Sequence, residues 1–380
     1  MAAAGRRGAA RVAAGAGAAG GPGAREGLGS GAGAGAGASG APGRDGRGRR
    51  VVVGDIGGTN ARLQLWGGGA GDSPGAQRTY PTADFLSFEA CLQAFLDEFS
   101  PREAPAVAVF AAAGPVSDHA HCAMTNISWE LDARSLERGG LVGQCRILND
   151  FEAIGYGVGA VAPEHLVSLH EGTRVERGPV LVLGPGTGFG QALLLWDAGW
   201  GRYRVHPSEG SHADFAPRGW KQRALAQHVE NELGYCEAEH VCCGSGLVRI
   251  YEFLRSGHAG PAGGRDAPPI LKDGAGVTSA ALSGESPLAL EACDIFLSIV
   301  GQEAGNGALR ALARGGVYVC GGITPRLQER VNTGGLRSAF LHAGSRFAPF
   351  LETVPVDLVT DGAVGMLGSR EYARIVEDEL

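Results

Sequence analysis

The chain has 380 residues, and its first fifty differ so much in composition from the rest that they form a separate segment. Residues 1–50 contain 17 Gly, 16 Ala and eight Arg, but only two acidic residues. A segment with so few large apolar side chains cannot offset its own ordering entropy, so we expect a disordered leader. The 330 residues that follow are enough for a two-domain α/β protein with a sizeable core.

The charge of the chain excludes several classes of partner. The whole chain has a net charge of −7, and because the leader is basic, residues 51–380 carry −13. A body this acidic is not built to neutralise the phosphates of a nucleic acid, so we expect no nucleic-acid partner. Since no run of eighteen apolar residues occurs, we also expect no transmembrane helix and no membrane partner.

The eight cysteines indicate a reducing compartment rather than a disulfide framework. They lie in apolar runs without a C-x-x-C pair, which is typical of small buried side chains. The adjacent pair Cys242 and Cys243 would suit redox sensing or a metal, but no further ligand set accompanies it.

The leader has two interpretations. Its many Arg and Ala residues and few acids partly fit an organellar transit peptide, although it has little Ser. The alternative is a low-complexity extension, which the use of 31 Arg against two Lys in the whole chain favours. The first interpretation predicts a plastid or a mitochondrion, and the second predicts the cytoplasm.

The body opens with a predicted hairpin. An apolar run at 51–53 breaks into the sequence GDIGGTN and resumes at 61–66 as ARLQLW. Two β-rich runs around a glycine turn indicate two antiparallel strands. A helix is predicted over 88–99 behind Ser87, and short buried strands over 106–113 and 146–148, which together indicate an α/β layer.

The same pattern recurs in the second half of the body. A strand at 180–183 enters a glycine turn at 184–190 and leaves at 192–196, and a third glycine junction follows the strand at 317–320. Helices are expected over 219–233, 247–255 and 288–312. The stretch 256–287, rich in Gly, Pro, Ser and Ala, is predicted to be a surface insertion.

Glycine turns between strands can present backbone N–H groups to phosphate oxygens. A single turn of this kind is more often an ordinary hairpin, but two in one chain, with Asp55, Thr59 and Thr187 inside them, favour a site for one triphosphate. Neither turn has the G-K-[ST] ending of a Walker loop or spells G-x-G-x-x-G before a helix.

At these motifs the chain resembles bacterial glucokinases of the actin, Hsp70 and hexokinase superfamily. Residues 54–62 (GDIGGTNAR) resemble the first phosphate loop, 184–190 (GPGTGFG) the second, and 320–323 (CGGI) the adenosine motif. Their order and spacing match from about Val51 to Arg370. The resemblance implies nucleotide binding by Gly54, Asp55, Gly57, Gly58, Thr59, Asn60, Gly184, Gly186, Thr187, Gly188, Gly321 and Gly322.

Polar residues at the end of the 146–148 strand are candidate sugar and catalytic groups. Residues 147–151 (ILNDF) place an amide and a carboxylate where α/β proteins commonly bind ligands, although an Asn-Asp pair there is by default a turn or a helix cap. The resemblance implies that Asp150 is the catalytic base and that Asn149 binds sugar hydroxyls together with it.

The segment 209–217 (EGSHADFAP) supplies the next candidates. A carboxylate, Glu209, three residues before an imidazole, His212, can bind adjacent hydroxyls. Metal binding is a weaker interpretation of this pair, because no further ligands stand nearby in the sequence. The resemblance makes both residues sugar ligands, while Ser211 replaces the usual Gly and Asp214 is expected to brace the loop.

A third acidic ligand is expected in the segment 237–247. Glu239 stands five residues before Gly244, as the contacting acid does in the family, whereas Glu237 is predicted to be a solvated charge at a helix end. The zinc-cysteine motif of the related repressor and kinase branch is absent from this sequence.

The resemblance implies an actin-like ATPase (ribonuclease H-like) fold with two α/β domains around a central cleft. The smaller domain would hold 51–160 plus 362–380, and the larger 161–361. The implied activity is ATP-dependent phosphorylation of glucose to glucose 6-phosphate, with Mg²⁺ held through water by Asp55. Because family members are often dimers, a homodimer is one expectation.

Three alternatives to this activity remain open. The first is a kinase for another hexose such as mannose or fructose. The second is a non-catalytic sugar sensor, which the intact Asp150 disfavours. The third is a chaperone-like or filament-forming ATPase, in which Glu209, His212 and Glu239 would have no task.

Overall fold

The computed structural model describes residues 49–67, 74–100, 103–257, 269–342 and 344–380. The predicted leader lies outside the described residues, and so does the centre of the predicted surface insertion. Within the described ranges, every helix is too short or too polar to cross a bilayer.

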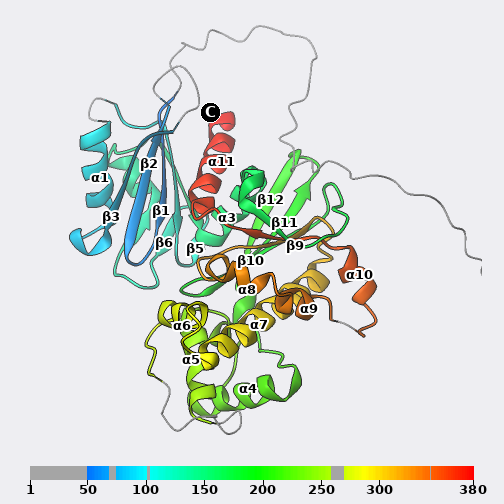
Figure 1. Cartoon of the computed structure of the whole chain (residues 1–380). Coiled ribbons are helices and arrows are strands. Elements are labelled where there is room, and N and C mark those ends of the chain that lie inside the picture. The colour runs from blue at the N-terminus through cyan, green and yellow to red at the C-terminus, as the bar shows by residue number, and fades with distance from the viewer. Residues whose placement is uncertain (1–48, 68–73, 101–102, 258–268, 343) are drawn as a thin grey trace, which may run out of the picture. The chain divides into compact units, whose positions relative to one another are not determined.

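The first sheet has five strands in the order β3-β2-β1-β4-β8 (Figure 1). Its members are β1 (Val51–Ile56), β2 (Asn60–Trp66), β3 (Pro74–Pro81), β4 (Val107–Ala112) and β8 (Gln144–Asn149). Strands β1, β4 and β8 run parallel, so their carboxyl ends share one edge. The predicted opening hairpin is confirmed, because β1 and β2 pair antiparallel.

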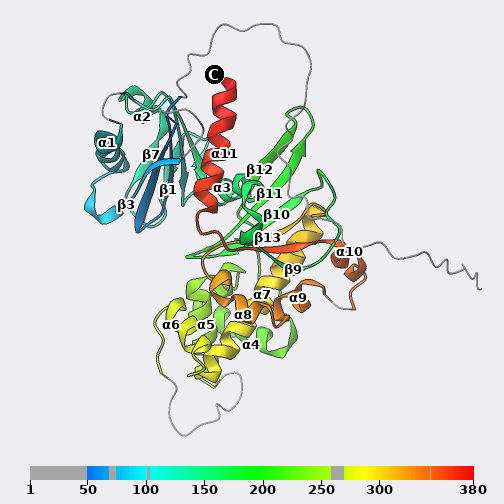
Figure 2. The same ribbon diagram turned by 45° about the horizontal axis from the view of Figure 1, so that its top comes forward.

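The two faces of this sheet are covered by different helices, α1 (Phe88–Phe99) and α11 (Val364–Glu379) (Figures 1 and 2). Side chains alternate along a strand, so Val52 packs into the cluster with α1, whereas Val51 and Val53 pack into the cluster with α11. Helix α1 begins where predicted, at Ser87, whose side chain accepts a hydrogen bond from Ala90 N at 3.3 Å.

The second sheet has six strands in the order β12-β11-β10-β13-β14-β9. They are β9 (Leu166–His170), β10 (Val180–Pro185), β11 (Phe189–Asp197), β12 (Arg202–Ser208), β13 (Gly316–Val319) and β14 (Val356–Val359). Strands β10 and β11 form the second predicted hairpin. A small sheet of β5 (Val116–Ser117), β6 (His121–Ala123) and β7 (Glu130–Asp132) was not predicted.

The remaining helices pack mainly around the long α7. They are α2 (Ala133–Arg138), α3 (Asp150–Gly157), α4 (Gly219–Leu233), α5 (Gly244–Arg255), α6 (Gly274–Leu282), α7 (Pro287–Ala311), α8 (Gln328–Val331), α9 (Gly335–Phe340) and α10 (Ala348–Thr353). Helix α7 contacts α5, α6 and α9 as well as the strands β10 and β13 (Figure 2). Its buried side chains make it the centre of the larger core.

The predicted surface insertion at 256–287 is wrong in part. Its second half forms α6, which packs on α5 and α7 and buries Val277 and Ala281. These two positions are one helical turn apart, and Asp273 caps the helix by accepting from Gly276 N at 2.7 Å. The segment is therefore partly core, although its composition is that of a loop.

Helices α3 and α11 cross at glycines, which lets their backbones touch. A Cβ atom at Gly368 of α11 would overlap the carbonyl oxygen of Ala153 in α3. Because α3 begins at the end of β8, this contact helps to fix the position of that strand end relative to α11.

We predict that Gly368→Ala destabilises the protein by about 1–3 kcal/mol or more, because the two backbones must separate. Gly365→Ala in the same helix is the control, since its added Cβ would meet only Ile154 Cγ1 at 3.8 Å. Urea unfolding of both variants measures the difference. Equal stabilities for the two would show that the helix crossing tolerates a side chain.

Candidate active site

The junction of β8 and α3 holds two of the predicted site residues. Asn149 caps the helix: its Oδ1 accepts from Phe151 N at 3.0 Å and from Glu152 N at 3.3 Å. Its Nδ2 donates to the carbonyl oxygen of Gly114 at 3.3 Å. The default interpretation of this residue as a cap is therefore confirmed, and the cap holds its side chain in one orientation.

Asp150 is the first residue of α3 and is largely removed from solvent. Burial raises its pKa to about 6, and the negative charges of Asp55 and Glu209 act in the same direction. A backbone hydrogen bond from Phe151 N, at 3.0 Å, opposes the rise but does not cancel it. The carboxylate is thus ionised at neutral pH but close enough to its pKa to accept a proton readily.

Asp55 lies at the same edge of the first sheet. It is in register with Ala111 of β4, which is in register with Leu148 of β8, so Asp55 and Asp150 lie two strands apart at the same edge of the sheet. Burial raises the pKa of Asp55, and Arg62 on the paired strand β2 partly offsets this rise.

The first glycine turn is fixed by hydrogen bonds within it and to Thr82. Gly57 N donates to Asn60 O at 2.9 Å, which closes the turn. Thr82 then fixes it through two hydrogen bonds of 2.9 Å, from its hydroxyl to Gly58 O and from its N–H to Thr59 O. Thr59 and Asn60 remain exposed. The turn is therefore rigid but open to a ligand, and the supporting role of Thr82 was not predicted.

The second glycine turn is packed against the predicted adenosine motif. A Cβ at Gly184 would come within 2.5 Å of Cys320 O, and Gly321 has a φ of +88°, in the left-handed region that suits glycine. Gly244 N donates to Gly186 O at 2.9 Å, while Thr187 is exposed. The two predicted nucleotide motifs thus lie side by side.

Glu239 connects the predicted sugar residues to the second glycine turn. Its Oε2 accepts from Phe189 N at 2.7 Å, and a Cβ at Gly188 would lie 2.7 Å from the same oxygen. A side chain at position 188 would therefore displace the carboxylate of Glu239.

Glu209 and His212 are the exposed members of the site, with 76% and 48% of their side chains accessible. His212 Nε2 lies 3.6 Å from Glu209 Oε2. Ser211, between them, is buried, so the residue that departs from the family pattern points inward. Asp214 braces the loop through its main chain, since it forms a backbone bridge with Glu237.

The prediction for Glu237 was wrong. It is only 9% exposed, and its Oε1 accepts a hydrogen bond of 3.0 Å from His212 Nδ1. The argument against metal ligands was also incomplete, because folding brings donor atoms of His212, Glu237 and Glu239 within 4.8 Å of one another. The backbone pairing of 213–215 with 236–238 produces this approach, and no short sequence motif signals it.

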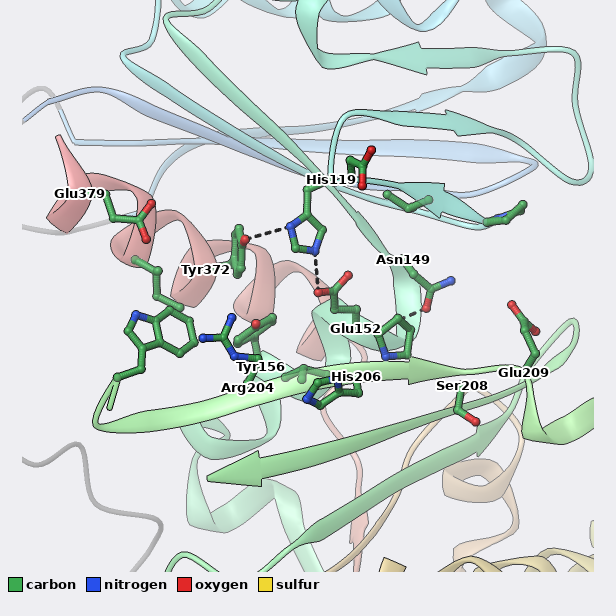
Figure 3. A pocket seen from close by; sticks show the side chains of 17 residues that line it. His119, Asn149, Glu152, Tyr156, Arg204, His206, Ser208, Glu209, Tyr372 and Glu379 are labelled. Carbon is green, nitrogen blue, oxygen red and sulfur yellow. Dashed lines mark hydrogen bonds and ion pairs between the residues drawn. The ribbon is translucent and has the colours of Figure 1, made fainter. Parts of the chain in front are cut away.

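A cavity of about 590 Å³ lies beside these residues (Figure 3). Asn149 and Glu209 line it, but Asp150, His212 and Glu239 do not. Its other wall holds a chain of hydrogen bonds that was not predicted: the buried Glu152 contacts His119 Nε2 at 2.9 Å, and the Tyr372 hydroxyl contacts His119 Nδ1 at 3.2 Å.

All eight cysteines are buried and none forms a disulfide, as predicted. Burial raises the pKa of the Cys242 thiol well above its ordinary value, so this side chain is not a reactive thiolate.

The fold and these residues define a sugar kinase on an actin-like ATPase fold. The family model described as Glucokinase matches residues 52–375. A glucokinase from Synechocystis is 35% identical, and the match covers 85% of this chain and 97% of the relative. A glucokinase from Chromohalobacter salexigens is 37% identical, again with 85% of this chain and 97% of the relative covered. The chain belongs to the glucokinase family.

Solved structures agree with this placement. A glucokinase from an Antarctic psychrotroph is 27% identical and superimposes with a TM-score of 0.73, covering 87% of this chain and all of the other. A glucokinase from Balamuthia mandrillaris, solved with glucose, has a TM-score of 0.72 at 22% identity over 86% of this chain and 94% of its own. Because the identity to this second structure is so low, its similarity shows a shared fold and nothing more.

Because its folded pKa of about 6 exceeds the ordinary 3.8, ionised Asp150 destabilises the native state. The cost is absent below pH 4 and complete above pH 6, where the pKa difference corresponds to about 3 kcal/mol. We therefore predict that Asp150→Asn raises the free energy of unfolding at pH 8 by up to that amount and leaves it unchanged at pH 4.

Urea unfolding at both pH values tests this, with the exposed Asp84→Asn as the control. A variant no more stable than wild type at pH 8 would contradict the burial of a charge at this position.

Proposed function

We propose that this chain is a glucokinase that transfers the γ-phosphoryl group of ATP to the 6-hydroxyl of glucose, with Asp150 as the general base. The observation that carries the proposal is the placement of Asp150, a half-buried carboxylate at the carboxyl end of a parallel strand, with a pKa raised to about 6. Ligands of α/β proteins bind at such strand ends, and a base with this pKa is ionised at neutral pH.

The sugar is held by the acids and the imidazole around Asp150. In this proposal Asn149, Glu209, His212 and Glu239 bind its hydroxyl groups and orient the 6-hydroxyl towards Asp150. The carboxylate takes the proton as the sugar oxygen forms a bond to the γ-phosphorus and the bond to the β-phosphate oxygen breaks. ADP leaves, and positioning supplies most of the acceleration.

ATP is held by main-chain groups in this proposal. The first glycine turn, stiffened by Thr82, and the second, packed on Cys320 and Gly321, offer backbone N–H groups that a phosphate can approach closely. The carboxylate of Asp55 fits Mg²⁺, because oxygen is the ligand that this ion prefers and its buried charge is only partly offset by Arg62. Bound there through water, Mg²⁺ would neutralise charge on the phosphate oxygens.

Three further expectations belong to the proposal. Residues 51–160 with 362–380 would close against 161–361 over the sugar and exclude water, a competing phosphoryl acceptor. The protein would act in the cytoplasm, or in a plastid or mitochondrion if the leader is a transit peptide. A homodimer stays a prediction.

A coupled assay for ADP with glucose, mannose and fructose separates the proposal from its rivals. Phosphorylation of glucose with the highest kcat/KM supports it. A better substrate among the other hexoses would make the chain a different hexokinase, and binding without turnover would make it a sensor.

For the base, we predict that Asp150→Asn lowers kcat by about 10²–10⁴ while glucose still binds, because the amide cannot take a proton. In the wild-type protein kcat/KM should fall as pH drops through about 6, where Asp150 becomes protonated. Turnover and calorimetric glucose binding are measured on the same folded samples. If the variant retained more than about a tenth of wild-type kcat, its activation barrier would have risen by less than about 1.4 kcal/mol. That result would exclude Asp150 as the base.

For the sugar ligands, we predict that Glu239→Gln lowers kcat/KM for glucose by about 10- to 100-fold, the usual cost of losing a charged hydrogen-bond partner. KM for ATP should change much less, since Gln can still accept from Phe189 N. Glu230→Gln, at an exposed position of α4, is the matched control. A parallel loss of affinity for ATP would place Glu239 in the nucleotide site instead.

A further inference from the structure

The position of His212 depends on a residue that no motif points to. Glu237 is buried, and its Oε1 lies 3.0 Å from His212 Nδ1 and 3.4 Å from His240 Nε2. His240 Nδ1 in turn accepts from Glu237 N at 3.4 Å, so this ring presents its protonated Nε2 to the carboxylate. One buried oxygen therefore stands between two imidazoles.

This arrangement defines which nitrogen of His212 is available. A carboxylate oxygen only accepts, so His212 Nδ1 must carry a proton and donate it. The remaining nitrogen, Nε2, faces Glu209, with 3.6 Å to its Oε2. Because half of the His212 side chain is exposed, packing restrains the ring little, and the hydrogen bond to the buried Glu237 is its shortest polar contact.

We propose that Glu237 is a positioning residue of the sugar site: it holds the Nδ1 side of His212 and thereby aims Nε2 at a hydroxyl group of the hexose. The inference rests on the proposed function, because it takes His212 to be a sugar ligand. A carboxylate that fixes the tautomer and orientation of an imidazole is a general device for presenting the other ring nitrogen.

The charges around His212 determine its protonation. The hydrogen bond to Glu237 raises the pKa of His212 most, the negative charges of Glu237, Glu239 and Glu209 raise it further, and partial burial opposes them. Removal of the charge on Glu237 should therefore lower the pKa of His212. This effect is independent of any sugar and is measured on the ligand-free protein.

Two variants separate orientation from charge. Glu237→Gln keeps an oxygen that accepts from His212 Nδ1 but removes the charge, whereas Glu237→Ala removes both. We expect KM for glucose to rise about tenfold in Glu237→Ala and about threefold in Glu237→Gln, with kcat changed less than about twofold, because a positioning contact acts in the ground state and the transition state alike. Glu230→Ala, at an exposed position of α4, is the control.

The second readout is the ¹⁵N–¹H spectrum of histidine side chains in the full chain, with the His212 signal identified by its loss in His212→Gln. In the wild type we expect Nδ1 of His212 to carry a proton over the whole titration, and the pKa of His212 to be raised above 6.5. In Glu237→Gln the pKa of His212 should fall. Spectra and glucose calorimetry are recorded in EDTA. If the variants differ from wild type only when Zn²⁺ is added, Glu237 is a metal ligand and the positioning role is overturned.

The outcomes distinguish this inference from the proposed function. Wild-type KM for glucose in both variants, together with an unchanged pKa of His212, would overturn the role of Glu237 while leaving the glucokinase activity intact. A protein that phosphorylates no hexose but shows the shifted pKa would refute the sugar assignment and keep the geometry. If Glu237→Ala does not fold, Glu237→Gln, which preserves volume and one hydrogen bond, carries the test.

Discussion

The candidate active site depends on a half-buried carboxylate at the start of a helix. Asp150 sits where β8 ends and α3 begins, and burial outweighs the backbone hydrogen bond that would otherwise keep its pKa low. Three neighbouring features keep it there: Asn149 caps α3, Phe151 lies on Gly190 of the second sheet, and α3 packs on α11 through glycines. The charge is thus held in place by packing on three sides.

In the proposed function, a hydrogen bond joins the sugar part of the site to the phosphate part. Glu239 accepts a hydrogen bond from Phe189 N in the second glycine turn, and its carboxylate lies within 4.8 Å of side-chain atoms of His212 and Glu237. A movement of the turn when phosphate binds would therefore also move a sugar ligand. In this proposal, the contact would let occupancy of one subsite influence the other directly.

Much of the fold was predictable because its signals are local. Both hairpins follow from glycine runs between Val- and Leu-rich runs, and α1 and α4 were predicted at their observed bounds. The strands of the small sheet, two or three residues long, leave no periodic pattern to detect. Helix α6 was missed because Gly, Ala and Ser dominate its sequence, although its cap Asp273 and the pair Val277 and Ala281 were visible signals.

The candidate site was only partly predictable for a different reason. Residues that end strands or fill glycine turns stand in recognisable motifs, so Asp55, Asn149 and Asp150 could be named from the sequence. Glu237 and the contact of Glu152 with His119 depend on segments that meet only after folding, 25 and 33 residues apart. Whether such a carboxylate faces solvent or makes a structural contact is determined by the tertiary structure, not by the neighbouring sequence.

The choice of main-chain groups for binding phosphate has a consequence for the base. A Lys or Arg close to Asp150 would attract a triphosphate, but it would also lower the pKa of the carboxyl and make it a weaker base. The side-chain charges that act on Asp150 are those of Asp55 and Glu209, and both are negative. Backbone N–H groups carry no net charge, so glycine turns can hold phosphate oxygens while Asp150 keeps its raised pKa. In the proposed function, the chain would therefore separate anion binding from proton transfer by using backbone dipoles for the first and the carboxylate of Asp150 for the second.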